Sequence, residues 1–202
     1  MEVEAATPSP REIEALAARI KHPLVLVGLM AVGKSTVGRK LAALLQFGFV
    51  DADEEIEKAA QMTIPEIFET YGEPYFRSGE RRVIARLIDE AQNGRTVLAT
   101  GGGAFADPES RALFLERGIA IWLDSDVDTL LERVSRKANR PLLKGGDPRA
   151  TLERLKAERG PAYAEAPIRV ESTLARISAP SWRSWRSSTN GCDPGRNAGR
   201  AL

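Results

Sequence analysis

A glycine-rich loop directly after a short apolar run constrains the fold of this chain more than any other feature of the sequence. The apolar run covers residues 24–27, and the loop at residues 28–35 has the pattern G-x-x-x-x-G-K-S. A run of this kind is typical of a strand that is buried on both faces of a parallel sheet. The glycines let the loop curl so that its backbone N–H groups face phosphate oxygens, and a following helix N-terminus adds partial positive charge. We therefore expect a strand, a phosphate-binding loop and a helix in succession.

The residue types in this loop predict that the chain binds ATP together with Mg²⁺. Lys34 offers a positive charge to the phosphates, and the hydroxyl of Ser35 is a ligand for the metal ion. A glycine turn followed by a chance Lys-Ser pair is the alternative, and the flanking strand and helix argue against it. The motif does not identify the phosphoryl acceptor. The expected ATP contacts are Gly28, Leu29, Met30, Ala31, Val32, Gly33, Lys34, Ser35 and Thr36.

The rest of the chain alternates between expected strands and expected helices. This alternation predicts βαβ units with right-handed crossovers and a parallel sheet with helices on both faces. The fold class is therefore α/β, a three-layer α/β/α fold with a P-loop. The expected strands are residues 24–27, 47–53, 96–100, 119–123 and 168–170. The expected helices are residues 11–20, 34–46, 54–60, one that begins at Thr63, 73–91, 107–118, 126–137 and 147–159.

Three regions are expected along the chain. Residues 1–22 form an N-terminal extension with a short helix, and residues 23–178 form the kinase domain, with a mobile lid at about residues 138–146. Residues 179–202 are expected to be a disordered tail, because they lack apolar periodicity. After Pro180 the chain has four arginines against one aspartate and two tryptophans, so an aromatic and basic patch for nucleic acid is the alternative for this tail.

Composition favours a cytoplasmic protein with no nucleic-acid or membrane partner. The chain has 29 basic and 28 acidic residues, and the net charge of +1 favours neither kind of partner. Cys192 is the one cysteine and His22 the one histidine, so neither an internal disulfide nor a zinc cluster is expected. The first residues are acidic where a signal peptide would be basic, and no apolar run approaches the ~18 residues that span a bilayer.

Two aspartates lie at the end of the second expected strand. Asp51 and Asp53 are two residues apart, so in a strand their carboxylates would point to the same face at the carboxyl edge of the sheet. One could help to hold hydrated Mg²⁺, and the other could accept a hydrogen bond from an acceptor hydroxyl and take its proton. The alternative is a pair of helix-capping acids, since Asp53 directly precedes an expected helix.

Four further segments, in order and at matching spacing, make the chain similar to the shikimate kinase family between about Leu24 and Pro167. The resemblance implies a five-stranded parallel sheet, and transfer of the ATP γ-phosphoryl group to the 3-hydroxyl of shikimate in the chorismate and aromatic amino-acid pathway. It also implies one Mg²⁺ per subunit and a monomer. The segments are Asp51-Ala52-Asp53, residues 75–80 with Arg77, residues 99–104 with the triple glycine, and Arg140-Pro141-Leu142-Leu143 with residues 159–163.

The resemblance also implies a role for individual residues. Ser35 and Asp51 match the Mg²⁺ partners, and Arg140 matches a lid arginine that reaches the nucleotide phosphates. Lys34, Asp53 and Arg140 are the expected catalytic residues. The expected shikimate contacts are Asp53, Arg77, Gly102, Gly103 and Arg159.

These roles agree with the chemistry of a small hydroxylated carboxylate. Arg77 and Arg159 each offer a planar fork of donors to the carboxylate. Glu80 lies three residues after Arg77 on an expected helix, so it could brace that arginine. Either Arg133 or Arg136 could stack on adenine, and the sequence does not choose between them.

The chain departs from the family pattern at two places. Ala31 and Val32 stand where the family loop has a small Gly-Ala pair, and the chain after about Ser178 lacks a convincing closing helix. Two other functions therefore stay open: a P-loop kinase for another small hydroxylated carboxylate, or an ATP-binding domain without catalysis. A screen of acceptors with ADP release as the readout would separate them.

Overall fold

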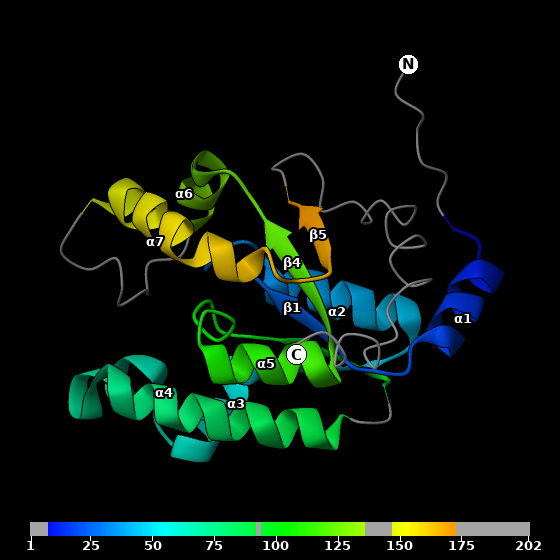
Figure 1. Ribbon diagram of the computed structural model, residues 1–202, viewed down its shortest axis with the longest axis horizontal. Helices are drawn as coiled ribbons and strands as arrows, with labels where there is room; N and C mark the ends of the chain where they lie inside the picture. Colours follow the sequence, from blue (N-terminus) through cyan, green and yellow to red (C-terminus); the bar gives the residue numbers. More distant parts are fainter. Residues whose placement is uncertain (1–7, 92–93, 136–146, 173–202) are drawn as a thin grey trace, which may run out of the picture.

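A parallel sheet of five strands forms the centre of the described structure (Figure 1). The computed structural model describes residues 8–91, 94–135 and 147–172. The strand order is β2-β3-β1-β4-β5, and every neighbouring pair is parallel. The strands are β1 (Leu24–Val27), β2 (Gly48–Asp51), β3 (Thr96–Ala99), β4 (Ile119–Asp124) and β5 (Ile168–Glu171). The predicted α/β fold with a five-stranded parallel sheet is confirmed.

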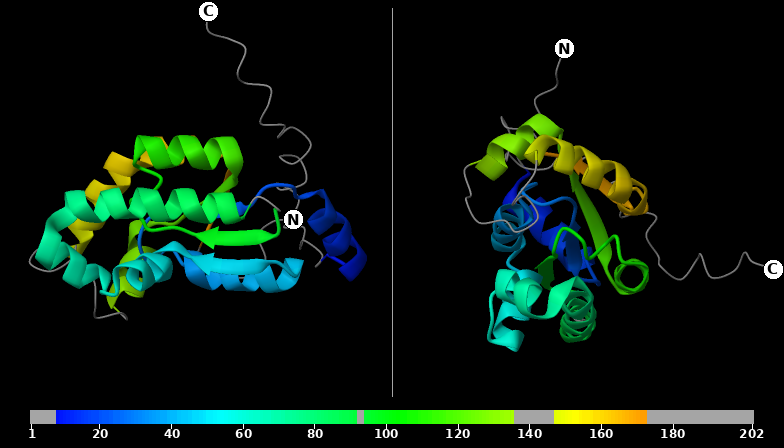
Figure 2. Two further views of the ribbon diagram at one scale, coloured as in Figure 1. Left: turned by 90° about the horizontal axis from the view of Figure 1, so that it is seen from below. Right: turned by 90° about the vertical axis from the view of Figure 1, so that its left-hand side faces the viewer.

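Helices cover both faces of this sheet, as Figure 2 shows for α2 and α5 on opposite sides. α2 packs against β1, β2 and β3, whereas α5 packs against β4 and α4. The helices are α1 (Pro10–Arg19), α2 (Lys34–Leu45), α3 (Ala52–Ala60), α4 (Ile64–Glu90), α5 (Pro108–Arg117), α6 (Val127–Ser135) and α7 (Pro148–Tyr163). Among these helices, none is long and apolar enough to cross a membrane.

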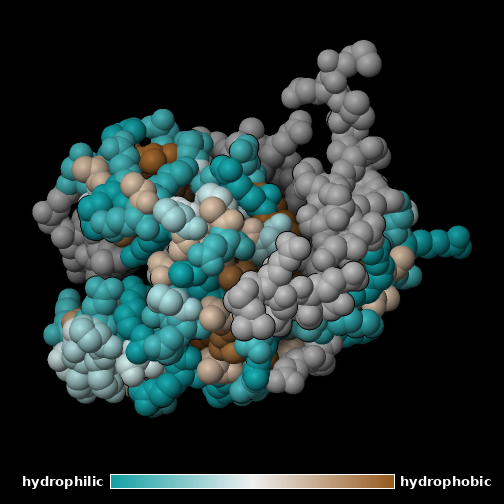
Figure 3. All heavy atoms as spheres, viewed as in Figure 1, coloured by the Kyte–Doolittle hydropathy of each residue, from teal (hydrophilic) through white to brown (hydrophobic). Residues whose placement is uncertain are grey.

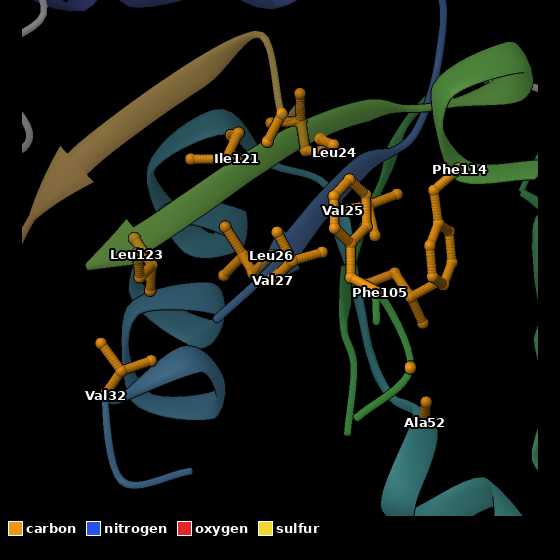
Figure 4. Packing of buried hydrophobic residues seen from close by; sticks show 14 of the residues in the cluster. Leu24, Val25, Leu26, Val27, Val32, Ala52, Phe105, Phe114, Ile121 and Leu123 are labelled. Atoms are coloured by element: carbon orange, nitrogen blue, oxygen red, sulfur yellow. The ribbon is translucent and has the colours of Figure 1, made fainter. Parts of the chain in front are cut away.

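The core is centred on β1, which lies between β3 and β4 and is covered on both faces. All four β1 side chains, from Leu24 to Val27, are fully buried. Phe105 and Phe114 pack beside them (Figure 4). Full burial of one such apolar side chain stabilises the fold by about 1.5–3 kcal/mol. Most of the coloured residues on the face seen in Figure 3 are hydrophilic. Because β1 is fully buried and leads directly into the phosphate loop, the core supports that loop.

Helix starts follow the capping signals in the sequence. Thr63 caps α4 in a capping box with Glu66, and Ser9 caps α1 in the same way with Glu12. Asp107 and Asp147 cap α5 and α7, each just before a proline. Such caps satisfy backbone N–H groups that have no partner within the helix. The predicted helix start at Thr63 is therefore confirmed.

Gly72 divides α4 into two segments. Its φ of 78° and ψ of 171° are not helical. A positive φ of this size favours glycine because it has no Cβ. The second segment begins at Glu73, so the two separate helices expected from the sequence are the two parts of α4.

Two predicted boundaries were wrong. The strand predicted over residues 47–53 ends at Asp51, because the Asp51 carboxylate accepts a hydrogen bond from the Asp53 backbone N–H at 3.1 Å and begins α3. The helix predicted to end near residue 159 continues to Tyr163, because burial of that aromatic ring outweighs the hydrogen bond lost at Pro161. The other boundaries within the described residues agree within two residues. The predicted end of the helix over residues 126–137, the lid and the tail lie outside the described residues.

Candidate active site

The carboxyl ends of β1, β2 and β3 lie side by side and bring three predicted segments together. The phosphate loop follows β1, Asp51 ends β2, and Thr100 with the triple glycine follows β3. Ligands of open α/β sheets bind at this edge. The topology therefore joins residues that are far apart in the sequence.

The phosphate loop depends on glycine at its first position. Gly28 has a φ of 135°, and a Cβ there would lie 2.3 Å from the Leu123 carbonyl oxygen. Ala31 also has a positive φ, 63°, although it is not glycine. A left-handed conformation costs a non-glycine residue about 1–2 kcal/mol. The departure from the family pattern at Ala31 is thus a strained residue within the loop.

Lys34 lies across this loop and is nearly buried. Its Nζ donates hydrogen bonds to the Gly28 carbonyl at 2.8 Å and to the Leu29 carbonyl at 2.9 Å. Carbonyl dipoles compensate part of the ammonium charge, and a phosphate oxygen would compensate it more fully. Lys34 is therefore held where the loop would receive an anion.

Ser35 and Asp51 place two oxygen atoms that could ligate a metal ion next to each other. The Ser35 hydroxyl donates to Asp51 Oδ2 at 2.6 Å. Mg²⁺ prefers oxygen ligands and is usually held by one or two protein groups together with phosphate oxygens and water. Within the described residues no group of three His, Cys, Asp or Glu side chains could hold a metal ion. The donor set fits Mg²⁺ bound jointly with a nucleotide.

Asp53 lies beside Asp51 but not in the predicted geometry. The two carboxylates were predicted to share one face of a strand, and this was wrong, because Asp53 lies in the first turn of α3. A Cβ on Gly101 would lie 2.9 Å from Asp53 Oδ1 and 2.8 Å from Glu80 Oε1. Asp53 therefore faces the triple glycine, while Asp51 faces Ser35.

Arg77 is enclosed by two glutamates and the triple glycine. Its Nη1 donates to Glu80 Oε2 at 2.6 Å, which confirms the predicted contact of Glu80 with Arg77. Its Nη2 donates to Glu73 Oε1 at 2.9 Å. A Cβ on Gly103 would lie 2.6 Å from Nη1, so glycine is required for this close approach.

Burial raises the pKa of the Glu80 carboxyl, and the contact with Arg77 acts in the opposite direction. The negative charges of Asp53 and Asp107 add to the effect of burial. Glu80 Oε1 has no hydrogen-bond partner within the described structure. This oxygen faces Gly101, on the same side as Asp53.

Arg159 and Tyr163 hold the triple glycine from α7. Arg159 Nη1 donates to the Gly102 carbonyl oxygen at 2.9 Å, and the Tyr163 hydroxyl donates to the same oxygen. Burial raises the pKa of Tyr163 to about 12. Its ring stacks near Trp122 and Phe105. Sequence reasoning assigned no role to Tyr163, although the residue lies in a motif that pointed to the site.

Arg133 contacts the phosphate loop. Its Nη1 donates to the Val32 carbonyl at 2.8 Å and to Ser172 Oγ at 3.1 Å. The other adenine candidate, Arg136, and the predicted lid arginine, Arg140, lie outside the described residues. Of the two adenine candidates, only Arg133 therefore has a described position, and it is next to the loop.

The family model described as Shikimate kinase matches residues 30–180 of this chain. The chain belongs to the shikimate kinase family. The shikimate kinase of Novosphingobium aromaticivorans is 69% identical over 173 residues, which cover 85% of this chain and 90% of that protein. The shikimate kinase of Rhodopseudomonas palustris is 56% identical over 168 residues, which cover 83% of this chain and 81% of that protein.

Solved shikimate kinases have the same fold as this family member. The structure of shikimate kinase from Acinetobacter baumannii in complex with shikimate has a TM-score of 0.73 at 40% identity and covers 78% of this chain and 88% of that one. Shikimate kinase from Aquifex aeolicus has a TM-score of 0.62 at 34% identity and covers 82% and 92%. The predicted family, fold and class of enzyme, an ATP-dependent kinase, are confirmed, whereas the roles of single residues stay predictions.

Proposed function

We propose that this shikimate kinase family member transfers the γ-phosphoryl group of ATP to the 3-hydroxyl of shikimate, a step in aromatic amino-acid biosynthesis. The observation that carries the proposal is the arrangement around the triple glycine. Asp53, Arg77 and Arg159 converge there from three helices, beside a loop that holds Lys34. A phosphoryl acceptor that carries a carboxylate would thus bind next to ATP, the phosphoryl donor.

The nucleotide side supplies positive charge. Residues 28–36 would surround the phosphates, with Lys34 directed at the oxygens that gain charge in the transition state. Ser35 and Asp51 would hold Mg²⁺, which when bound neutralises charge on the β- and γ-phosphates. Phosphoryl transfer proceeds through a loose transition state, so positioning and electrostatics supply most of the rate enhancement.

The acceptor side orients the hydroxyl and receives its proton. The 3-hydroxyl oxygen forms a bond to the γ-phosphorus as the bond from that phosphorus to the β–γ bridging oxygen breaks, and ADP leaves. The hydroxyl proton passes to the Asp53 carboxylate. Arg77 and Arg159 would bind the shikimate carboxylate, and Gly102 and Gly103 would let the main chain approach its hydroxyls.

The proposal has three further parts. Arg140 and the lid would close over the phosphates and exclude water. Arg133 is our choice for the adenine contact, because from α6 it donates a hydrogen bond to the Val32 carbonyl of the phosphate loop. We also propose a cytoplasmic monomer with one Mg²⁺ per subunit, with ATP and shikimate as its partners.

An ADP-release assay with ATP, Mg²⁺ and shikimate tests this function. Wild type should release ADP only when shikimate is present, and Arg77→Ala and Asp53→Asn should each lower kcat/KM for shikimate by at least about a hundredfold. Arg82→Ala is the matched control, because Arg82 is an exposed arginine on the same helix. Turnover with another hydroxylated carboxylate but not with shikimate would contradict the proposal.

A further inference from the structure

Arg77 contacts two carboxylates whose surroundings differ sharply. The side chain of Glu80 is 2% exposed, and that of Glu73 is 54% exposed. Glu80 accepts from Nη1, whereas Glu73 Oε1 accepts from both Nε, at 3.2 Å, and Nη2, at 2.9 Å. One glutamate is an interior partner of the arginine, and the other lies at the solvent side.

Glu73 occupies the part of the guanidinium that suits an incoming carboxylate. Nε and Nη2 present two parallel N–H groups, which form the donor fork that binds carboxylates most strongly. Gly103 packs against Nη1 and Nη2 so closely that a Cβ there would lie 2.6 Å and 2.7 Å from them. Glu80 accepts a hydrogen bond from Nη1 on the interior side of the guanidinium. A substrate carboxylate must therefore take the fork held by Glu73 or bind directly beside that negative charge.

The backbone places Glu73 where its side chain can move without loss of the helix. Gly72 breaks α4, so Glu73 begins the second segment. A glutamate in the first turn of a helix is favoured by the helix dipole whether or not it has an ion-pair partner. Tyr71 and Tyr75, two residues away on either side, are both half exposed. Release of Arg77 by Glu73 would thus leave the main chain in place.

We propose that Glu73 is a displaceable lock on Arg77, which holds the guanidinium in the empty acceptor site and competes with the substrate carboxylate for it. This inference rests on the proposed function, because it takes Arg77 as the partner of that carboxylate. Glu73 then sets the affinity for the acceptor, and its charge is a specificity determinant that selects for acceptors able to replace it. Glu80, in contrast, stays with Arg77 throughout.

Steady-state kinetics of Glu73→Gln test the lock. The amide removes the negative charge at nearly constant shape, so KM for shikimate should fall about two- to fivefold, the range expected for a half-exposed ion pair. Glu80→Gln should have the opposite effect and raise the KM for shikimate. Glu69→Gln is the matched control, because Glu69 is an exposed glutamate one turn earlier on α4 and has no ion pair among the described residues. It should match wild type.

Thermal unfolding with and without shikimate gives a second measurement that does not depend on turnover. A ligand raises Tm according to its affinity for the folded state, so saturating shikimate should raise the Tm of Glu73→Gln more than that of wild type. An unchanged or higher KM for Glu73→Gln, or a smaller Tm increase, would overturn the lock while the function stands. Wild type without shikimate-dependent turnover would overturn the function and the lock together.

Discussion

The nucleotide side and the acceptor side of the site are built in different ways. The nucleotide side is centred on one continuous segment, whose shape depends on backbone conformation at Gly28 and Gly33 and on hydrogen bonds from Lys34 to loop carbonyls. Asp51 and Arg133 contact this segment from β2 and α6. The acceptor side is assembled from α3, α4, α7 and the triple glycine, and ion pairs such as Arg77 with Glu80 hold it. From this difference we expect changes to the loop to lower turnover with every acceptor. Changes to the acceptor side should lower kcat/KM for shikimate above all.

Replacement of Lys34 should give the largest effect. Lys34→Met removes the charge that the loop directs at the phosphates, so kcat should fall by about 10²–10³-fold, the usual loss for one preorganised electrostatic group. Lys40→Met is the control, since Lys40 is an exposed lysine on the same helix. ADP release at saturating shikimate measures both. A kcat for Lys34→Met within tenfold of wild type would contradict the proposed role.

Gly103→Ala should act on the acceptor side with a smaller but selective effect. The new Cβ would lie 2.6 Å from Arg77 Nη1, so the guanidinium must shift, and its hydrogen bond to buried Glu80 opposes that shift. kcat/KM for shikimate should fall about 10–100-fold, because a displacement near 1 Å is enough for such a loss. KM for ATP should stay within about twofold of wild type if the two sides are independent.

Gly79→Ala is the matched control for this substitution. Gly79 lies on α4, and a Cβ there would have no neighbour within 4 Å. Alanine in a helix should stabilise the protein by about 0.5–1 kcal/mol without a change in the kinetics. Equal effects of the two substitutions on kcat/KM would show that close approach at Gly103 is unimportant.

Tyr163→Phe should give a moderate loss. The substitution removes one of two donors to the Gly102 carbonyl and leaves Arg159 as the other. The free energy of unfolding should fall by about 0.5–1.5 kcal/mol, the usual net value of one such hydrogen bond. Chemical denaturation measures it, with the exposed Tyr71→Phe as the control. Equal stability of both variants would mean that the Tyr163 hydroxyl does not hold the glycine loop.

The pH dependence of stability should give the smallest effect, through Glu80. The unfolded chain titrates this carboxyl near the ordinary glutamate pKa of about 4.3, and burial raises the pKa in the folded protein. Between the two values the folded state binds more protons, so the free energy of unfolding contributed by Glu80 falls as the pH rises through the folded pKa. The free energy of unfolding of wild type minus that of Glu80→Gln should therefore be largest below about pH 4 and decline above it. A flat or rising difference would contradict the raised pKa.

Sequence reasoning predicted the strand, the loop and the helix of the phosphate-binding segment, because that segment carries its own signals. The glycines, Lys34 and Ser35 are local, and their conformation follows from residue type and flanking structure. The strand order and the approach of Gly103 to Arg77 depend on contacts across the chain. Glu80 was found because a spacing of three residues on a helix already implies contact.

The acceptor side also shows where local reasoning stops. Asp51 and Asp53 were assigned to one strand face, but a capping hydrogen bond of Asp51 starts a helix between them. Glu73 was missed although it begins the expected helix 73–91 and lies four residues before Arg77, a spacing that implies contact on a helix. Tyr163 was missed because its partner, the Gly102 carbonyl, lies on a loop 61 residues away in the chain.

The most direct test of the central claim, one site with two sides, is to identify the product by phosphorus NMR. Wild type with ATP, Mg²⁺ and shikimate should yield ADP and one phosphate monoester coupled to the proton on carbon 3 of shikimate. Arg77→Ala should bind ATP as wild type does and form the monoester at least about a hundredfold more slowly under the same conditions. ATP hydrolysis to inorganic phosphate without a monoester in wild type, or full monoester formation by Arg77→Ala, would contradict the account.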